Sequence, residues 1–236
     1  MALNNVLEQL RQLRVIPVVR TSTPELAVTA IEWLSEAGLR TFEITLTIPD
    51  AVELIAKYAL RKDILIGAGT VTNVLQAERC LDSGANYLVS PSVVPELPEI
   101  SHQQEVPCFL GALTPTELHN AVRAGADAVK IYPINHMGGA SYLKALTSVF
   151  PEVALIPTGG IKTNEIFQYL NSGAACVGLG GELVNETLIR EGQREKSFNL
   201  VRKFCNRWLH FHIRKSHETG CALYRRTFAG IQSNSG

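Results

Sequence analysis

Eight short runs of β-branched and apolar residues, each followed by an amphipathic stretch, constrain this chain more than any other feature. The runs comprise residues 15–20, 41–46, 64–70, 87–91, 108–112, 128–133, 154–160 and 176–181. Most are almost continuously hydrophobic, which is typical of strands covered on both faces, and each intervening segment is long enough for one helix. The sequence therefore predicts eight βα units.

Glycine and proline mark the expected ends of the helices. A glycine stands between a helical pattern and the next predicted strand at four places: Gly38, Gly84, Gly125 and Gly173. Glycine is favoured there because it adopts the left-handed conformation that ends a helix. Prolines are expected in the first turns of four helices, at Pro24, Pro49, Pro95 and Pro115.

Eight such units most economically close into one α/β domain, a (β/α)8 TIM barrel, which commonly takes about 250 residues. The alternative is an open doubly wound sheet, but no GxGxxG motif follows the first strand. We expect a short N-terminal helix and a barrel domain over residues 1–213, with its last covering helix at 193–213. Residues 214–236 show no period and are expected to form an irregular, poorly ordered extension.

Composition argues against several classes of protein. Residues 201–236 hold seven Lys or Arg against one acid, but no nucleic-acid-binding module accompanies them, so no nucleic-acid partner is expected. The five cysteines include no CxxC pair and the six histidines no HExxH grouping, so no metal is expected. No apolar run reaches the ~18 residues of a membrane helix. The start lacks a signal-peptide pattern, so we expect a cytoplasmic protein without membrane contact.

Lys130 is the first candidate catalytic residue. It alone among the eight lysines lies inside an apolar predicted strand. Strand alternation points its side chain into the barrel, while Val129 and Ile131 face the helices. Burial disfavours the charged ammonium and favours an amine that can attack a carbonyl carbon. The alternative is a structural ion pair, which is disfavoured because lysine is seldom buried.

Glu43 is the only carboxylate in the middle of a predicted strand. Alternation turns Glu43 and Thr45 inward and Phe42 and Ile44 outward. A carboxyl group beside an amine in a partly dry barrel can pass protons. Its structural alternative is to neutralise Lys130. Both interpretations predict that the two side chains meet.

Glycine-rich turns follow the last two predicted strands, at 159–160 and 180–181. Barrel enzymes often bind phosphate there, where backbone N–H groups and a helix N-terminus converge. Tight loops are the alternative explanation. A further segment, Gly67-Ala68-Gly69-Thr70, permits close backbone approach and places a hydroxyl group at a strand end.

A series of motifs gives the chain a family resemblance. The motifs are Ile16-Pro17-Val18-Val19, Glu43-Ile44-Thr45-Leu46, Gly67-Ala68-Gly69-Thr70-Val71, Val89-Ser90-Pro91, Thr114-Pro115-Thr116-Glu117, Lys130-Ile131-Tyr132-Pro133, Gly138-Gly139 with Leu143-Lys144-Ala145-Leu146, and Pro157-Thr158-Gly159-Gly160-Ile161. In their order and spacing, across roughly residues 5–205, they resemble the bacterial 2-keto-3-deoxy-6-phosphogluconate/4-hydroxy-2-oxoglutarate (KDPG/KHG) aldolases.

The resemblance implies a class I aldolase, a carbon–carbon lyase that forms a Schiff base with its substrate. Such an enzyme cleaves a 2-keto-3-deoxy-6-phospho sugar acid, as in the Entner-Doudoroff pathway of carbohydrate metabolism, or 4-hydroxy-2-oxoglutarate. The products are pyruvate and an aldehyde. Lys130 matches the Schiff-base lysine, Glu43 the general acid/base, and Tyr132 the aromatic residue beside the lysine.

The resemblance also implies binding residues and an assembly. Thr70, Pro91 and Thr158 match positions that line the pyruvate pocket, and Gly159 and Gly160 match one arm of the phosphate site. Such enzymes need no cofactor and are typically homotrimers. The expected partners are therefore the keto-acid substrate, pyruvate and two further copies of the chain.

The chain departs from the family pattern at two binding positions. Thr47 stands where the phosphogluconate enzymes carry the arginine that binds the substrate carboxylate, and Arg20, at the end of the first strand, is the expected substitute. Gly181, beside Gly180 in the strand-eight turn, stands where a serine is expected. Glu182 follows, and its charge would oppose a phosphate if it pointed inward.

These departures leave two alternatives open. One is a non-catalytic or altered-specificity barrel that binds keto acids or sugar phosphates, since the arginine and the serine are missing. The other is a phosphate-binding barrel isomerase or synthase, which would use the glycine turns but give Lys130 no covalent role.

Overall fold

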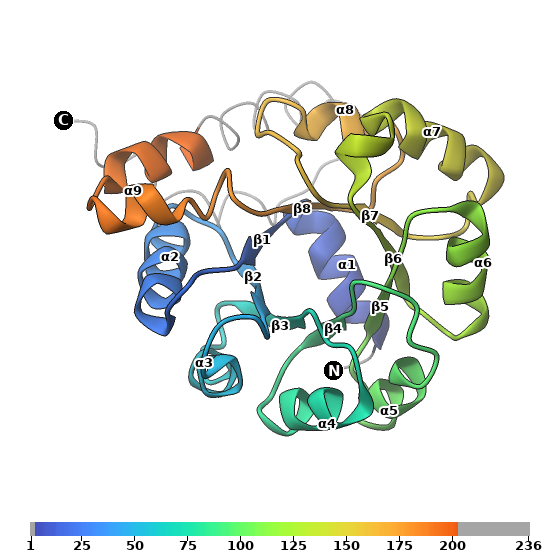
Figure 1. Ribbon diagram of the computed structural model, residues 1–236, viewed down its shortest axis with the longest axis horizontal. Helices are drawn as coiled ribbons and strands as arrows, with labels where there is room; N and C mark the ends of the chain where they lie inside the picture. The colour runs from blue at the N-terminus through green and yellow to red at the C-terminus, as the bar shows by residue number, and fades with distance from the viewer. Residues whose placement is uncertain (1–2, 203–236) are drawn as a thin grey trace.

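The computed structural model describes residues 3–202. Its eight parallel strands form a nearly closed barrel surrounded by helices (Figure 1). The strands are Val15–Val19 (β1), Thr41–Thr45 (β2), Leu65–Gly69 (β3), Tyr87–Val89 (β4), Cys108–Ala112 (β5), Ala128–Ile131 (β6), Leu155–Pro157 (β7) and Val177–Leu179 (β8). The predicted (β/α)8 barrel is thereby confirmed.

Each strand pairs in parallel with its neighbour in sequence, from β1 through β7, and β8 pairs with β1. Two isolated bridges, Leu155 to Ala174 and Thr158 to Gly178, join β7 to β8 and bring the ring close to closure. Most strands end earlier than the apolar runs predicted. The runs continue into loops at the carboxyl ends of the strands, the end of a TIM barrel that carries the active site.

Helices cover the outside of the ring and close one of its ends. They are Leu3–Leu13 (α1), Pro24–Glu36 (α2), Ala51–Ala59 (α3), Val74–Asp82 (α4), Leu97–Gln103 (α5), Pro115–Arg123 (α6), Gly139–Val149 (α7), Ile166–Asn171 (α8) and Glu186–Arg190 (α9), with a 3-10 turn at Ile134–Met137 (η1). Pro24 and Pro115 open their helices behind threonine caps, as predicted. Pro49 and Pro95 instead lie two residues before α3 and α5.

The glycines between helices and strands adopt the predicted left-handed conformation. Their φ angles are 106° at Gly38, 88° at Gly84, 93° at Gly125 and 98° at Gly173. Residues 194–202 are helical, in agreement with the last predicted helix. The rest of that helix and the predicted extension at 214–236 lie outside the described residues. Within residues 3–202, no helix is long and apolar enough to cross a membrane.

The apolar core has two layers. The larger one lies between the strands and the outer helices, and it contains Phe42, Ile44, Val129 and Ile131, as alternation predicted. The smaller one fills the barrel interior toward the amino ends of the strands, where side chains of α1 pack against inward-facing residues. Its buried members are Val6 and Leu10 of α1 together with Ile16, Leu65, Tyr87, Val89, Phe109, Ala128, Ala154, Ile156, Ala175 and Cys176. Figure 1 views α1 through the ring. The predicted N-terminal helix thus closes one end, and the opposite end stays open.

Candidate active site

Lys130 and Glu43 meet inside the barrel. The Lys130 Nζ atom donates a hydrogen bond to Glu43 Oε1 at 2.9 Å. The two side chains are only 9% and 4% exposed. They come from β6 and β2, which lie on opposite sides of the eight-stranded ring. Both inward orientations predicted from strand alternation are therefore correct.

Glycines on neighbouring strands flank this pair, and one of them, Gly69, makes room for the carboxylate. Gly67 lies opposite Glu43 in the β2–β3 register, and Gly111 lies opposite Lys130 in the β5–β6 register. A Cβ atom on Gly69, at the end of β3, would lie 2.3 Å from Glu43 Oε1. Real Cβ atoms essentially never approach that closely. The missing side chain of Gly69 therefore provides the space that the carboxylate occupies.

The other ionisable groups inside the barrel are kept neutral by burial. Burial raises the pKa of the Cys176 thiol to about 12 and the pKa of the Tyr87 phenol well above its usual value. The Tyr87 hydroxyl lies 2.9 Å from Thr41 Oγ1, and its ring stacks on Phe109. A buried thiol of this kind is a poor nucleophile. Among the described interior residues, Lys130 is therefore the better candidate nucleophile.

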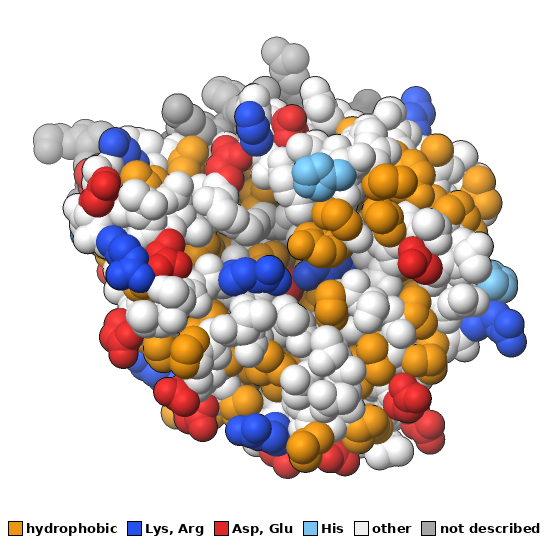
Figure 2. Space-filling view, viewed as in Figure 1, with side chains coloured by type: hydrophobic (Ala, Val, Ile, Leu, Met, Phe, Trp, Pro, Cys, Tyr) orange, Lys and Arg blue, Asp and Glu red, His pale blue; other side chains and the backbone are white. Residues whose placement is uncertain are grey.

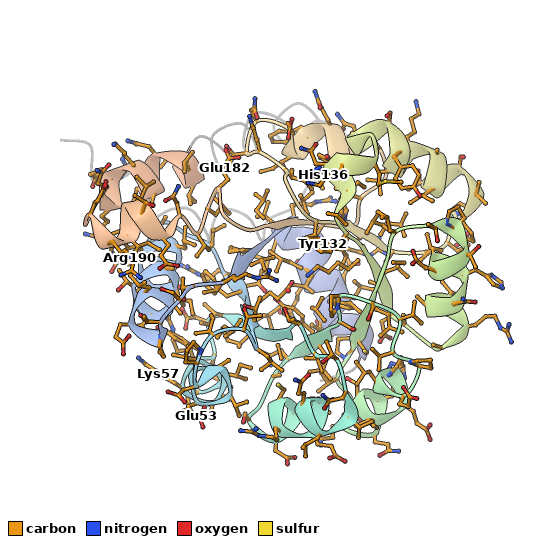
Figure 3. All side chains as sticks on the ribbon, in the orientation of Figure 1. Glu53, Lys57, Tyr132, His136, Glu182 and Arg190 are labelled. Atoms are coloured by element: carbon orange, nitrogen blue, oxygen red, sulfur yellow. The ribbon has the colours of Figure 1, made fainter. Side chains whose placement is uncertain are left out.

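Tyr132 lies just above the pair, where β6 ends. Its ring centroid is 5.9 Å from Lys130 Nζ, within the range of a cation–π contact. Gly159 allows this arrangement, because a Cβ atom there would be 2.9 Å from the Tyr132 ring. Gly159 also has a φ of 99°, which favours glycine. Figure 3 shows Tyr132 on the open face of the barrel.

The remaining residues predicted for the pyruvate pocket lie at the ends of β3, β4 and β7. Thr70 directly follows β3 and has a φ of 63°. The Pro91 carbonyl lies against β5, where a Cβ atom on Gly111 would be 2.2 Å from it. Thr158 is buried, and its hydroxyl fits beside Gly178, where a Cβ atom would be 2.3 Å away. The fold therefore places all three at the end of the barrel that carries Lys130.

Arg20 and Thr47 are both exposed, at the ends of β1 and β2. Arg20 makes no hydrogen bond or ion pair with another residue of the described range 3–202. The Thr47 hydroxyl instead lies 2.8 Å from Thr45 Oγ1. A residue of α9 holds the loop that follows Arg20, because the Ser22 N–H donates a hydrogen bond to Glu186 Oε2 at 3.0 Å. This contact joins residues 164 positions apart, and no local sequence pattern marks it.

The turns after β7 and β8 form the rim beside the pair. Gly160 lies against Asn135, since a Cβ atom added to Gly160 would be 2.8 Å from the Asn135 side chain. Gly180 and Gly181 face open space, since a Cβ atom added to either would meet nothing within 4 Å. Glu182 Oε1 accepts a hydrogen bond from Thr163 Oγ1 at 2.8 Å, across the two turns. Thr163 was not among the residues that the sequence singled out, since no local pattern marks it.

Figure 2 shows a hollow at the centre of the open face, with Lys or Arg and acidic side chains in it. Within residues 3–202, no group of three or more His, Cys, Asp or Glu side chains is arranged to hold a metal ion. The charged groups placed to act on a ligand in the interior are therefore an amine and a carboxyl group. This pair is suited to attack on a carbonyl carbon with proton transfer.

Sequence comparisons identify relatives with named activities. The family model for KDPG and KHG aldolase matches residues 6–200. The 2-dehydro-3-deoxy-phosphogluconate aldolase of Treponema pallidum is 36% identical over 168 residues, which cover 70% of this chain and 79% of that protein. The KHG/KDPG aldolase of Escherichia coli K12 is 30% identical over 193 residues, covering 80% and 89% respectively.

Solved structures give the same result. The KDPG aldolase of Legionella pneumophila, captured with pyruvate as a covalent carbinolamine intermediate, has a TM-score of 0.73 and 31% identity, covering 83% of this chain and 96% of that one. The 3-hexulose-6-phosphate synthase of Salmonella typhimurium, at 13% identity and a TM-score of 0.64, shares the fold alone. Since the family model spans most of the sequence, the chain belongs to the KDPG and KHG aldolase family.

Proposed function

We propose that the chain is a class I aldolase that cleaves a 2-keto-3-deoxy sugar acid, or 4-hydroxy-2-oxoglutarate, to pyruvate and an aldehyde. The observation that carries this proposal is the buried contact between Lys130 and Glu43 at the open end of the barrel. A lysine held in a dry interior and facing a ligand site is suited to form a Schiff base.

In the proposed reaction, the Lys130 amine attacks the keto carbon of the substrate and forms a carbinolamine. Loss of water gives a protonated imine, which withdraws electrons from the adjacent carbon–carbon bond. That bond breaks as the hydroxyl group beyond it loses its proton, and the aldehyde leaves. The remaining enamine takes up a proton at carbon, and water then hydrolyses the imine to release pyruvate and the free amine.

Glu43 is proposed to carry the protons. Its carboxylate lies 2.9 Å from Lys130 Nζ and accepts the proton that the ammonium must lose before attack. The carboxyl group gives that proton to the carbinolamine hydroxyl, which leaves as water, and is a carboxylate again. It then receives a proton from the substrate hydroxyl and returns it to the enamine carbon. Proton transfer within the pair leaves two neutral groups, which suits a buried site because burying an isolated charge is costly.

The binding roles are proposed from position and chemistry. Arg20 binds the substrate carboxylate, with Thr47 beside it. Thr70, Pro91, Tyr132 and Thr158 line the pyruvate half of the site. The turns at 159–160 and 180–181 contact the far end of the substrate.

A barrel that binds keto acids without turning them over is the second candidate. It is favoured by Thr47, which stands where the family has an arginine. Pyruvate release from 2-keto-3-deoxygluconate, from KDPG, from 2-keto-3-deoxy-6-phosphogalactonate and from 4-hydroxy-2-oxoglutarate, followed with coupled lactate dehydrogenase, distinguishes the two. Release from at least one supports the aldolase. Binding by calorimetry without release from any of them supports the second candidate.

We further propose a homotrimer that acts in the cytoplasm, in a step of the Entner-Doudoroff type. An oligomer is supported by a designed protein cage made by fusing symmetric oligomeric domains, which matches the chain with a TM-score of 0.73 at 28% identity. The number of three copies is proposed from the family resemblance. Light scattering coupled to size-exclusion chromatography measures the assembly directly. The mass of a monomer or a dimer would contradict the trimer.

Arg20→Ala is expected to raise the KM for the keto acid about 10- to 100-fold with a smaller effect on kcat, because a hydrogen bond to a charged group contributes about 1.5–3 kcal/mol. Steady-state kinetics checks this. Arg79→Ala, which removes an exposed arginine of α4, is the matched control and should behave like the parent. An unchanged KM in Arg20→Ala would exclude the carboxylate-binding role.

Gly69→Ala is expected to lower kcat on the order of 10²-fold, because the new methyl group would occupy the place of Glu43 Oε1. Displacing a catalytic group by about 1 Å has an effect of that size. The control is Gly84→Ala, which strains the helix end between α4 and β4, two elements that carry neither Lys130 nor Glu43, and should lower the melting temperature but preserve activity. Full activity in a folded Gly69→Ala protein would show that the carboxylate position is unimportant.

A further inference from the structure

The rim beyond β7 and β8 is where a barrel enzyme commonly binds the phosphate of its substrate. In this chain, the rim has space but carries negative charge. Gly180 and Gly181 face open space, and the half-buried Glu182 follows them directly. Figure 3 shows Glu182 on the same open face as Tyr132 and His136.

The Glu182 carboxylate is held between the two turns. Its Oε1 atom accepts the Thr163 hydroxyl at 2.8 Å, and Thr163 belongs to the loop after β7. That hydroxyl proton is therefore used by the protein and is not offered to a phosphate oxygen. The contact also restrains the carboxylate from turning away from the rim.

Glu182 forms no ion pair with any cation among the residues that the structure describes. Lys162, the nearest cation along the loop after β7, is exposed and makes no ion pair with it. The backbone N–H of Lys162 donates instead to Glu165 Oε2 at 2.9 Å. A carboxylate without a cation repels an anionic group placed beside it and accepts hydrogen bonds from hydroxyl groups.

Resting on the proposed aldolase function, we infer that Glu182 selects substrates whose far end is uncharged and carries hydroxyl groups. The substrate class is the unphosphorylated 2-keto-3-deoxy sugar acid. Its terminal hydroxyl groups donate to Glu182 in the open space beside Gly180 and Gly181. A terminal phosphate, or the second carboxylate of 4-hydroxy-2-oxoglutarate, meets like charge at the same place.

The test compares kcat/KM for pyruvate release from 2-keto-3-deoxygluconate and from its 6-phosphate. The parent is expected to prefer the unphosphorylated acid by at least about 10-fold, because phosphorylation replaces a hydroxyl group that donates to the carboxylate with an anion that the carboxylate repels. Glu182→Gln is expected to reduce this preference at least about 10-fold, mainly by improving use of the phosphate ester. Glu152→Gln, which removes an exposed charge just before β7 at the closed end, should leave the preference unchanged.

Trapping of pyruvate on Lys130 by borohydride is measured in parallel and separates the two levels of the proposal. If the parent chain shows no trapping of pyruvate on Lys130, the aldolase function itself is overturned. Intact trapping with a parent that prefers the 6-phosphate overturns only the role of Glu182. If Glu182→Gln keeps intact trapping and the parental preference for the unphosphorylated acid, the role of Glu182 is likewise overturned.

Discussion

Lys130→Met is expected to lower kcat/KM for pyruvate release by about 10⁴-fold or more, because methionine preserves the shape of the side chain but cannot attack a carbonyl carbon. Removing a covalent nucleophile typically has an effect of this order. The assay is pyruvate release coupled to lactate dehydrogenase. Residual turnover within about 100-fold of the parent would exclude a covalent role for this amine.

A stability control accompanies this variant. Methionine leaves the Glu43 carboxylate buried without its partner, and removing one member of a buried ion pair costs about 3–5 kcal/mol. The double variant Lys130→Met/Glu43→Gln is expected to recover much of that stability without recovering activity. Lys57→Met, on the exposed surface of α3 (Figure 3), is the matched lysine control and should keep full activity.

Glu43→Gln is expected to lower kcat on the order of 10²- to 10⁴-fold, the usual contribution of a general acid/base. Glutamine retains a hydrogen-bond acceptor for Lys130 but cannot exchange a proton. Exchange of the pyruvate methyl protons with heavy water, followed by NMR, reports the proton-transfer step directly and should slow in parallel with kcat. Glu53→Gln on α3 is the matched control (Figure 3).

Two outcomes separate catalysis from structure in the Glu43 variant. If Glu43 only neutralises Lys130, the melting temperature falls while proton exchange continues at the parental rate. If Glu43 transfers the proton, exchange slows even in protein that remains folded at the assay temperature. A parental exchange rate would therefore remove Glu43 from the proposed reaction.

Local periodicity explains why the Lys130–Glu43 contact could be predicted from the sequence. Strand alternation fixes whether a side chain faces the barrel or the helices, and closure of eight strands leaves one interior for all inward-facing residues. A lysine and a glutamate that both face inward from opposite strands therefore meet. The left-handed glycines at helix ends were predictable for a similar reason, since each depends only on its own turn.

Contacts made by loop residues with distant segments were not predictable in this way. Thr163 with Glu182, and Ser22 with Glu186, join segments whose separation depends on the conformations of two irregular turns. The space that Gly69 leaves for the Glu43 carboxylate also became apparent only from the coordinates. The predictions for Pro49 and Pro95 were wrong, because the helix pattern does not show where a loop ends and the first helical turn begins.

The most direct measurement is reduction of the chain with borohydride in saturating pyruvate, followed by mass spectrometry of its peptides. One three-carbon adduct per chain is expected, located on Lys130, and absent from protein treated with borohydride alone. An unmodified Lys130 under saturating pyruvate, or an adduct spread over exposed lysines such as Lys57, would contradict the account.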